Sequence, residues 1–122
     1  MNGRKLLIVD DDEAVGDLIR RIGEKEGFRT RVLLESTQFQ EVCSAFEPDV
    51  ILLDVVMPNA DGVELLRYLA ERRCTAKIIV VSGYGANYLS MAEHLGEAQG
   101  LSAVQTLTKP IDINELRGAL SD

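Results

Sequence analysis

The sequence contains few cysteines, and none belongs to a recognisable motif. Cys43 and Cys74 are too few and too far apart to read as the disulfide framework of a small secreted domain. Neither has a partner in a CxxC motif, so the sequence predicts no metal or redox role for them. Cys43 falls on the apolar stripe of an expected helix and is interpreted as a small core residue.

Positive charge is also scarce. Thirteen lysines and arginines stand against 20 aspartates and glutamates, which gives a formal net charge of −7. Binding to a nucleic-acid backbone requires clustered basic residues. The composition therefore argues against direct nucleic-acid binding by this chain.

No long apolar run is present. A membrane-spanning helix needs about 18 consecutive apolar residues, and the longest candidate, residues 49–57, is interrupted by Asp54. The N-terminus turns acidic after a short apolar run and has no small-residue cleavage site, which is untypical of a secretion signal. We therefore expect a cytoplasmic protein that makes no membrane contact.

The length of 122 residues fits one domain with its own core. Hydrophobic residues make up 46% of the chain and charged residues 27%, a balance typical of globular proteins. Residues 1–122 are expected to form a single domain. Because few residues follow Pro110, we also expect that this domain can be the N-terminal part of a longer protein.

Apolar runs alternate with amphipathic segments along the whole chain. The residues from Val50 to Leu53 are all apolar, as in a buried strand, whereas Val15, Leu18, Ile19 and Ile22 recur at helical spacing. The pattern predicts strands at residues 5–9, 29–34, 50–54, 78–81 and 103–108, each followed by a helix. Expected helix boundaries are Gly27 and Gly100 as ends, and Ser36 or Thr37, Asp61 and Asp112 as starts.

Five repeats of strand and helix predict an α/β fold. Apolar strands separated by helices are typical of a five-stranded parallel sheet that is doubly wound, with helices on both faces. Right-handed crossovers place the carboxyl ends of all strands at one edge of the sheet, where ligands of such folds bind.

Polar residues follow four of the five predicted strands. Asp10 and Asp11 follow the first, Asp54 ends the third, Ser82 ends the fourth and Lys109 follows the fifth. Each alone can be a cap or turn residue, but three neighbouring carboxylates repel one another unless positive charge compensates them. Lys109 supplies one positive charge. Mg²⁺, which prefers carboxylates, water and phosphate oxygens, can supply the remainder.

Four blocks of sequence form a signature together. LLIVDDDE, ILLDVVMPNADG, IIVVSGYG and TLTKPID occur in this order over nearly the whole chain. Their order and spacing resemble the receiver domain of two-component response regulators. The resemblance implies a flavodoxin-like (βα)5 three-layer sandwich that accepts a phosphoryl group on Asp54, with Mg²⁺, from a histidine kinase or histidine phosphotransfer protein. It implies a conformational switch that controls an output domain or effector protein, and no turnover of a separate substrate.

The same resemblance assigns a role to each residue of the site. Asp54 would be the phosphoacceptor and would help to bind Mg²⁺. Asp11 would be a direct metal ligand, and Asp10 would act mainly through a metal-bound water. The backbone carbonyl of Val56 would be a further metal ligand, and Ser82 and Lys109 would contact the phosphoryl group. Gly83 would allow the backbone to approach that group. Pro110 would be a cis proline that orients Lys109.

One position departs from the pattern of this family. Receiver domains usually carry an aromatic residue three positions before the lysine, and here that position is Thr106. A threonine displaces too little volume to reshape a surface by changing its rotamer. We therefore expect Ser82 to signal through the loop that follows it, with Tyr84 moving instead. Whether phosphorylation drives formation of a homodimer is left open.

Three other functions are less consistent with the sequence. A degenerate receiver, which binds partners without being phosphorylated, would lack an acidic ligand, the acceptor or the lysine, and all are present. A phosphoaspartyl hydrolase usually has a second aspartate two residues after its nucleophile, where this chain has Val56. A nucleotide-binding domain would carry GxxxxGK[ST] or GxGxxG, and the sequence has neither.

Overall fold

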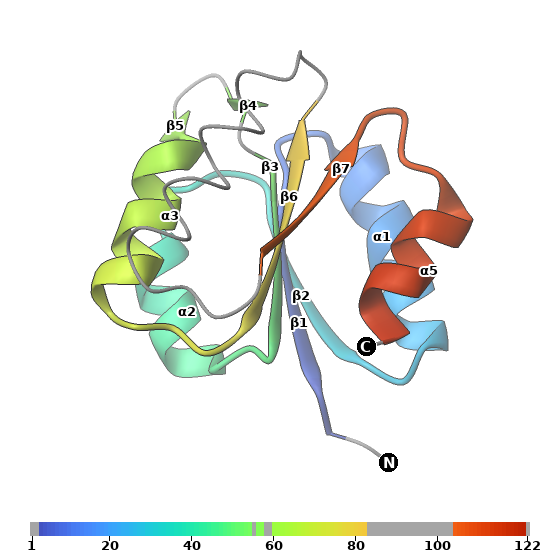
Figure 1. The fold of residues 1–122 in the computed structure, drawn as a ribbon, viewed down its shortest axis with the longest axis horizontal. Coiled ribbons are helices and arrows are strands. Elements are labelled where there is room, and N and C mark those ends of the chain that lie inside the picture. The colour runs from blue at the N-terminus through green and yellow to red at the C-terminus, as the bar shows by residue number, and fades with distance from the viewer. Residues whose placement is uncertain (1–2, 55, 58–59, 83–103, 122) are drawn as a thin grey trace.

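The computed structural model describes residues 3–54, 56–57, 60–82 and 104–121, and its centre is a five-stranded sheet (Figure 1). The strands are β1 (Lys5–Val9), β2 (Arg29–Leu33), β3 (Val50–Asp54), β6 (Lys77–Ser82) and β7 (Val104–Thr108). They lie in the order β2-β1-β3-β6-β7, and every neighbouring pair is parallel. The predicted parallel α/β architecture is confirmed.

Helices cover both faces of this sheet. Helices α1 (Glu13–Lys25) and α5 (Ile113–Ser121) lie on one face, and α2 (Phe39–Phe46) and α3 (Gly62–Glu71) lie on the other (Figure 1). The helix predicted at residues 87–99 lies outside the described residues. No helix in the described part of the chain is both long and apolar enough to cross a membrane.

Side chains alternate along the strands between two core clusters. Leu7 and Val9 of β1 pack under α2 and α3, whereas Leu6 and Ile8 pack under α1 and α5. All five residues of β3 are buried, including Asp54 at its carboxyl end. A strand covered on both faces reads as a continuous apolar run, and this is why β3 was recognisable from its sequence.

Two short strands follow β3 and were not predicted. Strand β4 (Val56–Met57) pairs antiparallel with β5 (Ala60–Asp61), and Val56 lies opposite Asp61. The backbone that follows Asp54 therefore belongs to a small hairpin-like pair, and α3 begins directly after it.

The helix starts were predicted with mixed success. Asp112 caps α5 as expected, since its Oδ1 accepts hydrogen bonds from the N–H groups of Asn114 and Glu115. The prediction for α2 was wrong, because its N-cap is Gln38, without a side-chain hydrogen bond. The Thr37 hydroxyl bonds instead to Glu35. Residue 61, the expected cap of α3, is the last residue of β5.

One member of the predicted apolar stripe of α1 does not reach the core. Ile19 and Ile22 are buried as expected, but the side chain of Leu18 is 41% exposed. Helical spacing identified the correct face of the helix. It could not show how far α5, which packs against α1, extends over that face.

Helices α1 and α3 end in the same hydrogen-bonding motif with different residues. In α1, Gly27 has a φ of 94° and its N–H donates to Glu24, while the N–H of Phe28 donates to Gly23. In α3, Arg73 occupies the equivalent position with a φ of 53°. The N–H groups of Arg73 and Cys74 donate to Ala70 and Leu69. Both ends are Schellman motifs, in which glycine is usual at the left-handed position.

Replacing Arg73 by glycine should therefore stabilise the protein. The left-handed conformation costs a residue with a Cβ about 1–2 kcal/mol, and the greater backbone freedom of glycine in the unfolded chain offsets part of that gain. We expect Arg73→Gly to raise the free energy of unfolding in urea by about 0.5–1 kcal/mol. Gly27→Ala is the matched control and should lower it. Loss of stability in Arg73→Gly would contradict this account of the α3 terminus.

Candidate functional site

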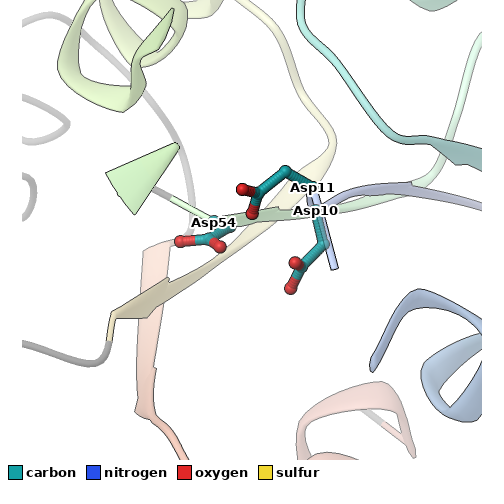
Figure 2. Close-up of side chains that lie close together, drawn as sticks. All are labelled: Asp10, Asp11 and Asp54. Atoms are coloured by element: carbon teal, nitrogen blue, oxygen red, sulfur yellow. The ribbon is translucent and has the colours of Figure 1, made fainter. Parts of the chain in front are cut away.

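Three carboxylates lie together at the carboxyl edge of the sheet. Asp10 and Asp11 follow β1, and Asp54 ends the neighbouring strand β3 (Figure 2). One carboxylate oxygen from each residue lies within 4.8 Å of those of the other two. Asp10 and Asp54 are buried, with exposed fractions of 0% and 1%, whereas Asp11 is exposed. The floor of the site is therefore buried, whereas its rim at Asp11 is exposed.

The backbone around Asp10 fixes the position of its side chain. The N–H of Asp10 donates to Leu33 of β2, and Asp10 Oδ1 accepts a hydrogen bond of 2.9 Å from the N–H of Asp12. Burial raises the pKa of Asp10, and the charge of Asp54 acts in the same direction. The hydrogen bond from Asp12 and the proximity of Lys109 oppose this rise only in part.

Lys109 brings one positive charge to the two buried carboxylates. Its Nζ donates a hydrogen bond of 3.0 Å to Asp54 Oδ2 and lies 3.3 Å from Asp10 Oδ2. Burial lowers the pKa of Lys109, but the hydrogen bond to Asp54 and the charges of Asp10 and Asp54 outweigh that effect and raise it. The ammonium group is therefore protonated at neutral pH. The peptide bond between Lys109 and Pro110 is cis.

The contact between Lys109 and Asp10 is an ion pair without hydrogen-bond alignment. At 3.3 Å the two groups attract one another, yet Asp10 Oδ2 is buried and has no hydrogen-bond partner among the residues that the structure describes. An ammonium group already aligned with Asp54 is poorly directed at a second acceptor, so the contact with Asp10 is electrostatic. A buried carboxylate oxygen without such a partner remains available to a cation or water.

The donor set fits a hard divalent cation. Three closely spaced carboxylates with one ammonium group leave negative charge in excess, and two of these carboxylates are buried. Mg²⁺ prefers one or two carboxylates together with waters and phosphate oxygens. The open rim beside Asp11 leaves room for those additional ligands.

The structure places the other predicted site residues to different extents. Ser82 ends β6 beside Thr108 of β7, at the same edge of the sheet as Asp54, and its side chain is outside the described part. Val56 lies in β4, two residues after Asp54. Thr106 is half-buried in β7 opposite Val80 of β6. Gly83 and Tyr84, predicted to take part in the switch, lie outside the described residues.

Asp12 has a role different from its two acidic neighbours. Its Oδ1 accepts hydrogen bonds of 3.0 Å and 3.2 Å from the N–H groups of Ala14 and Val15. It is therefore the N-cap of α1. The three consecutive aspartates thus divide into two that face Asp54 and one that begins a helix.

Comparisons with known proteins place these features in one family. The profile described as "Response regulator receiver domain" matches residues 6–121. The chain is 32% identical to sporulation initiation phosphotransferase F of Bacillus subtilis, and the alignment covers 98% of this chain and 93% of that protein. It is 33% identical to the photosynthetic apparatus regulatory protein RegA of Rhodobacter capsulatus, covering 96% of this chain but only 61% of that protein.

Solved structures agree with the family match. The crystal structure of a response regulator signal receiver domain from Bermanella marisrubri superposes with a TM-score of 0.84 at 28% identity. The superposition covers 99% of this chain and 98% of that one. The likeness therefore extends over the whole domain and not only over the acidic site.

Substitution of Asp11 should weaken metal binding, whereas substitution of Asp12 should lower stability. Asp11→Ala should weaken Mg²⁺ binding by at least about tenfold, because it removes a carboxylate from the site. Asp12→Ala should leave that affinity nearly unchanged and lower the free energy of unfolding by about 1 kcal/mol, through loss of the helix cap. Mg²⁺ titration and urea denaturation of both variants measure the two effects. A larger loss of affinity in Asp12→Ala would exchange the two roles.

The ionised carboxylate of Asp10 should destabilise the metal-free protein. Because folding raises the pKa of Asp10 above 3.8, its contribution to stability is present below that value and is lost as the pH rises through the folded-state pKa. In the absence of Mg²⁺, Asp10→Asn should therefore be more stable than the unsubstituted protein at pH 7, and the difference should shrink toward pH 3. Urea denaturation across this pH range in EDTA measures it. A pH-independent difference would refute the electrostatic explanation.

Proposed function

The chain belongs to the response regulator receiver domains of two-component signal transduction, and on this basis we propose that Asp54 accepts the phosphoryl group. The observation that carries the proposal is the buried Asp54 carboxylate, hydrogen-bonded by Lys109 at 3.0 Å. Asp10 and Asp11 lie within 4.8 Å of it. A nucleophile, a cation and a pair of metal-ligating carboxylates are the groups that phosphoryl transfer requires.

The proposed donor is a phosphohistidine on a histidine kinase or histidine phosphotransfer protein. An oxygen of Asp54 attacks the phosphorus atom, a P–O bond forms, the P–N bond breaks, and the imidazole leaves with the bonding electrons. Lys109 shields the Asp54 carboxylate as the negatively charged donor approaches, and its ammonium can then pair with a phosphoryl oxygen. We assign the Ser82 hydroxyl to a second phosphoryl oxygen.

The proposed metal is Mg²⁺, held by Asp10, Asp11, Asp54 and the backbone carbonyl of Val56. When bound, Mg²⁺ neutralises charge on the transferring phosphoryl group and orients it toward the acceptor. Asp10 acts from the buried floor of the site, where its Oδ2 lacks a hydrogen-bond partner among the described residues. Asp11 acts from the exposed rim.

We propose that the chain controls its own phosphorylation and dephosphorylation and is not a turnover enzyme. Val56 stands where phosphoaspartyl hydrolases carry their second aspartate, so no general acid or base follows the nucleophile at that spacing. The domain would act in the cytoplasm on an output domain or effector protein. The chain spans 61% of RegA and 93% of the sporulation phosphotransferase. These relatives therefore support either arrangement, an output domain in the same protein or a separate effector protein.

Phosphorylation should add one phosphoryl group, and only to Asp54. Treatment with Mg²⁺ and acetyl phosphate should raise the intact mass by one phosphoryl group, with no continuing release of phosphate beyond slow autodephosphorylation. Asp54→Asn should show no increase. Asp12→Asn is the matched control, because asparagine keeps the helix cap, and it should be labelled normally. The same mass increase in Asp54→Asn would refute the acceptor assignment, and rapid multiple turnover would favour a hydrolase.

We propose that the switch begins at Ser82 and passes to the segment that includes Gly83 and Tyr84. Thr106 has no large ring to move, and it lies in β7, at the edge of the five-stranded sheet, where it pairs with Val80 of β6. Amide hydrogen exchange with and without beryllofluoride should therefore change at residues 83–88 and remain constant around Thr106. The reverse pattern would reject this route and leave the acceptor assignment intact.

A further inference from the structure

A cavity of about 600 Å³ lies at the opposite end of the sheet from Asp54. It opens at the amino ends of β3 and β6, between the C-terminal ends of α2 and α3. Both cysteines of the chain line it, together with Tyr68 and Arg72. The proposed phosphoryl transfer uses none of these residues.

The packing of two parallel helices brings the cysteines to the same cavity. The ring of Phe39 on α2 meets the ring of Tyr68 on α3 edge to face, with centroids 6.0 Å apart. Cys43 lies one turn further along α2. Arg72 lies four residues after Tyr68, just past the end of α3, and Cys74 follows two residues later. Cys43 and Cys74 are both half-buried and pack against the same core cluster. They are 31 positions apart in sequence but adjacent to one cavity.

The backbone on both sides of this cavity is strained. Glu47 at the end of α2 and Arg73 at the end of α3 line the cavity, and each has a φ of 53°. Left-handed residues other than glycine are uncommon, and they concentrate at functional sites. At α3, this conformation also fixes Cys74, whose N–H donates to Leu69 at 3.0 Å. Two strained helix ends thus hold the two cysteine-bearing segments beside one another.

Burial makes the Cys43 thiol unreactive. Burial raises the pKa of the Cys43 thiol to about 11, the charge of Cys74 adds to this effect, and Arg72 opposes it. Cys43 is consequently protonated at neutral pH and is a poor nucleophile. The pKa of the Cys43 thiol responds to the charge of Cys74, which is further support for the proximity of the two residues. A reaction with an oxidant should therefore begin at Cys74.

The surroundings favour a dithiol over a metal site. In the part of the chain that the structure describes, the one group of three or more potential metal ligands with mutually close ligand atoms is Asp10, Asp11 and Asp54. No third ligand therefore accompanies the two thiols at such distances. Two cysteines without further ligands are better suited to oxidation than to binding Zn²⁺, which needs four ligands at structural sites.

We propose that Cys43 and Cys74 form a reversible disulfide when the protein is exposed to a peroxide. The Cys74 sulfur attacks a peroxide oxygen, the O–O bond breaks, and sulfenic acid and water are produced with the thiol proton. The Cys43 sulfur then attacks the sulfenic sulfur, an S–S bond forms, and the hydroxyl leaves with the Cys43 proton as water. Two thiols are oxidised and one peroxide is reduced.

This bond would link the segments at the C-terminal ends of α2 and α3, both at the amino end of the sheet. The closed ring would contain residues 43–74, and therefore all of β3 with Asp54 at its end. Cross-linking these residues restricts the unfolded chain. Such a bond inside a cytoplasmic protein would be transient and regulatory, because thiols there are normally kept reduced.

Mass spectrometry of the full chain after treatment with hydrogen peroxide tests the proposal. At low protein concentration, the folded protein should lose two hydrogen atoms and both free thiols. Proteolysis without reductant should yield a peptide pair linked through Cys43 and Cys74, and dithiothreitol should restore both thiols. Because the fold places both cysteines at one cavity, the linkage should form at least about tenfold faster than in concentrated urea.

Single variants separate the two sulfurs. Cys43→Ser should gain one oxygen at Cys74, whereas Cys74→Ser should keep its Cys43 thiol under the same treatment. Circular dichroism checks that each variant is folded. If a variant does not fold, the peptide map of the unsubstituted protein alone shows whether Cys43 and Cys74 are linked. Oxygen addition without S–S linkage, linkage between separate chains, or equal rates in the folded and unfolded protein would each overturn the proposal.

Discussion

The contact of one ammonium group with two buried carboxylates is the interaction around which this domain is organised. Lys109 lies 3.0 Å from Asp54 and 3.3 Å from Asp10. Without it, two negative charges would sit in a nearly water-free environment at the end of an apolar sheet, a costly arrangement. The same contact links the end of β7 to the ends of β1 and β3, so the same residues serve the chemistry of the site and the stability of the fold.

The sheet makes this arrangement possible because its strands bury apolar side chains along their lengths and carry the acidic groups of the site at one edge. Strands β1 and β3 are neighbours and are apolar along their lengths, so they bury their side chains on both faces. Their acidic residues lie at the carboxyl ends or directly after them, where the excess of negative charge can be offset by a cation. Asp12 uses the same stretch of chain for a different purpose, since it begins α1 and so fixes the direction in which the chain leaves the site.

The two ends of the sheet differ in their chemistry. The carboxyl end holds oxygen ligands and a lysine, which suit hard cations and phosphoryl groups. The amino end, between α2 and α3, holds two thiols beside helix termini with left-handed residues. Strand β3 runs from one end to the other, with Asp49 before it at the cavity and Asp54 at the acidic site. A constraint on α2 and α3 therefore acts on the two helices that cover one face of the sheet around β3.

The sequence alone determined the five strands of the parallel sheet, four of the helices, and the gathering of Asp10, Asp11 and Lys109 around Asp54. These follow from short-range patterns: a fully apolar run for β3, a polar residue at its end, and the rule that parallel strands share one carboxyl edge. The cap at Asp12 was also local. The cap of α2, the exposure of Leu18 and the pairing of β4 with β5 were decided by tertiary structure. The approach of Cys43 to Cys74 was decided in the same way, because helix packing brings together residues that no sequence motif connects.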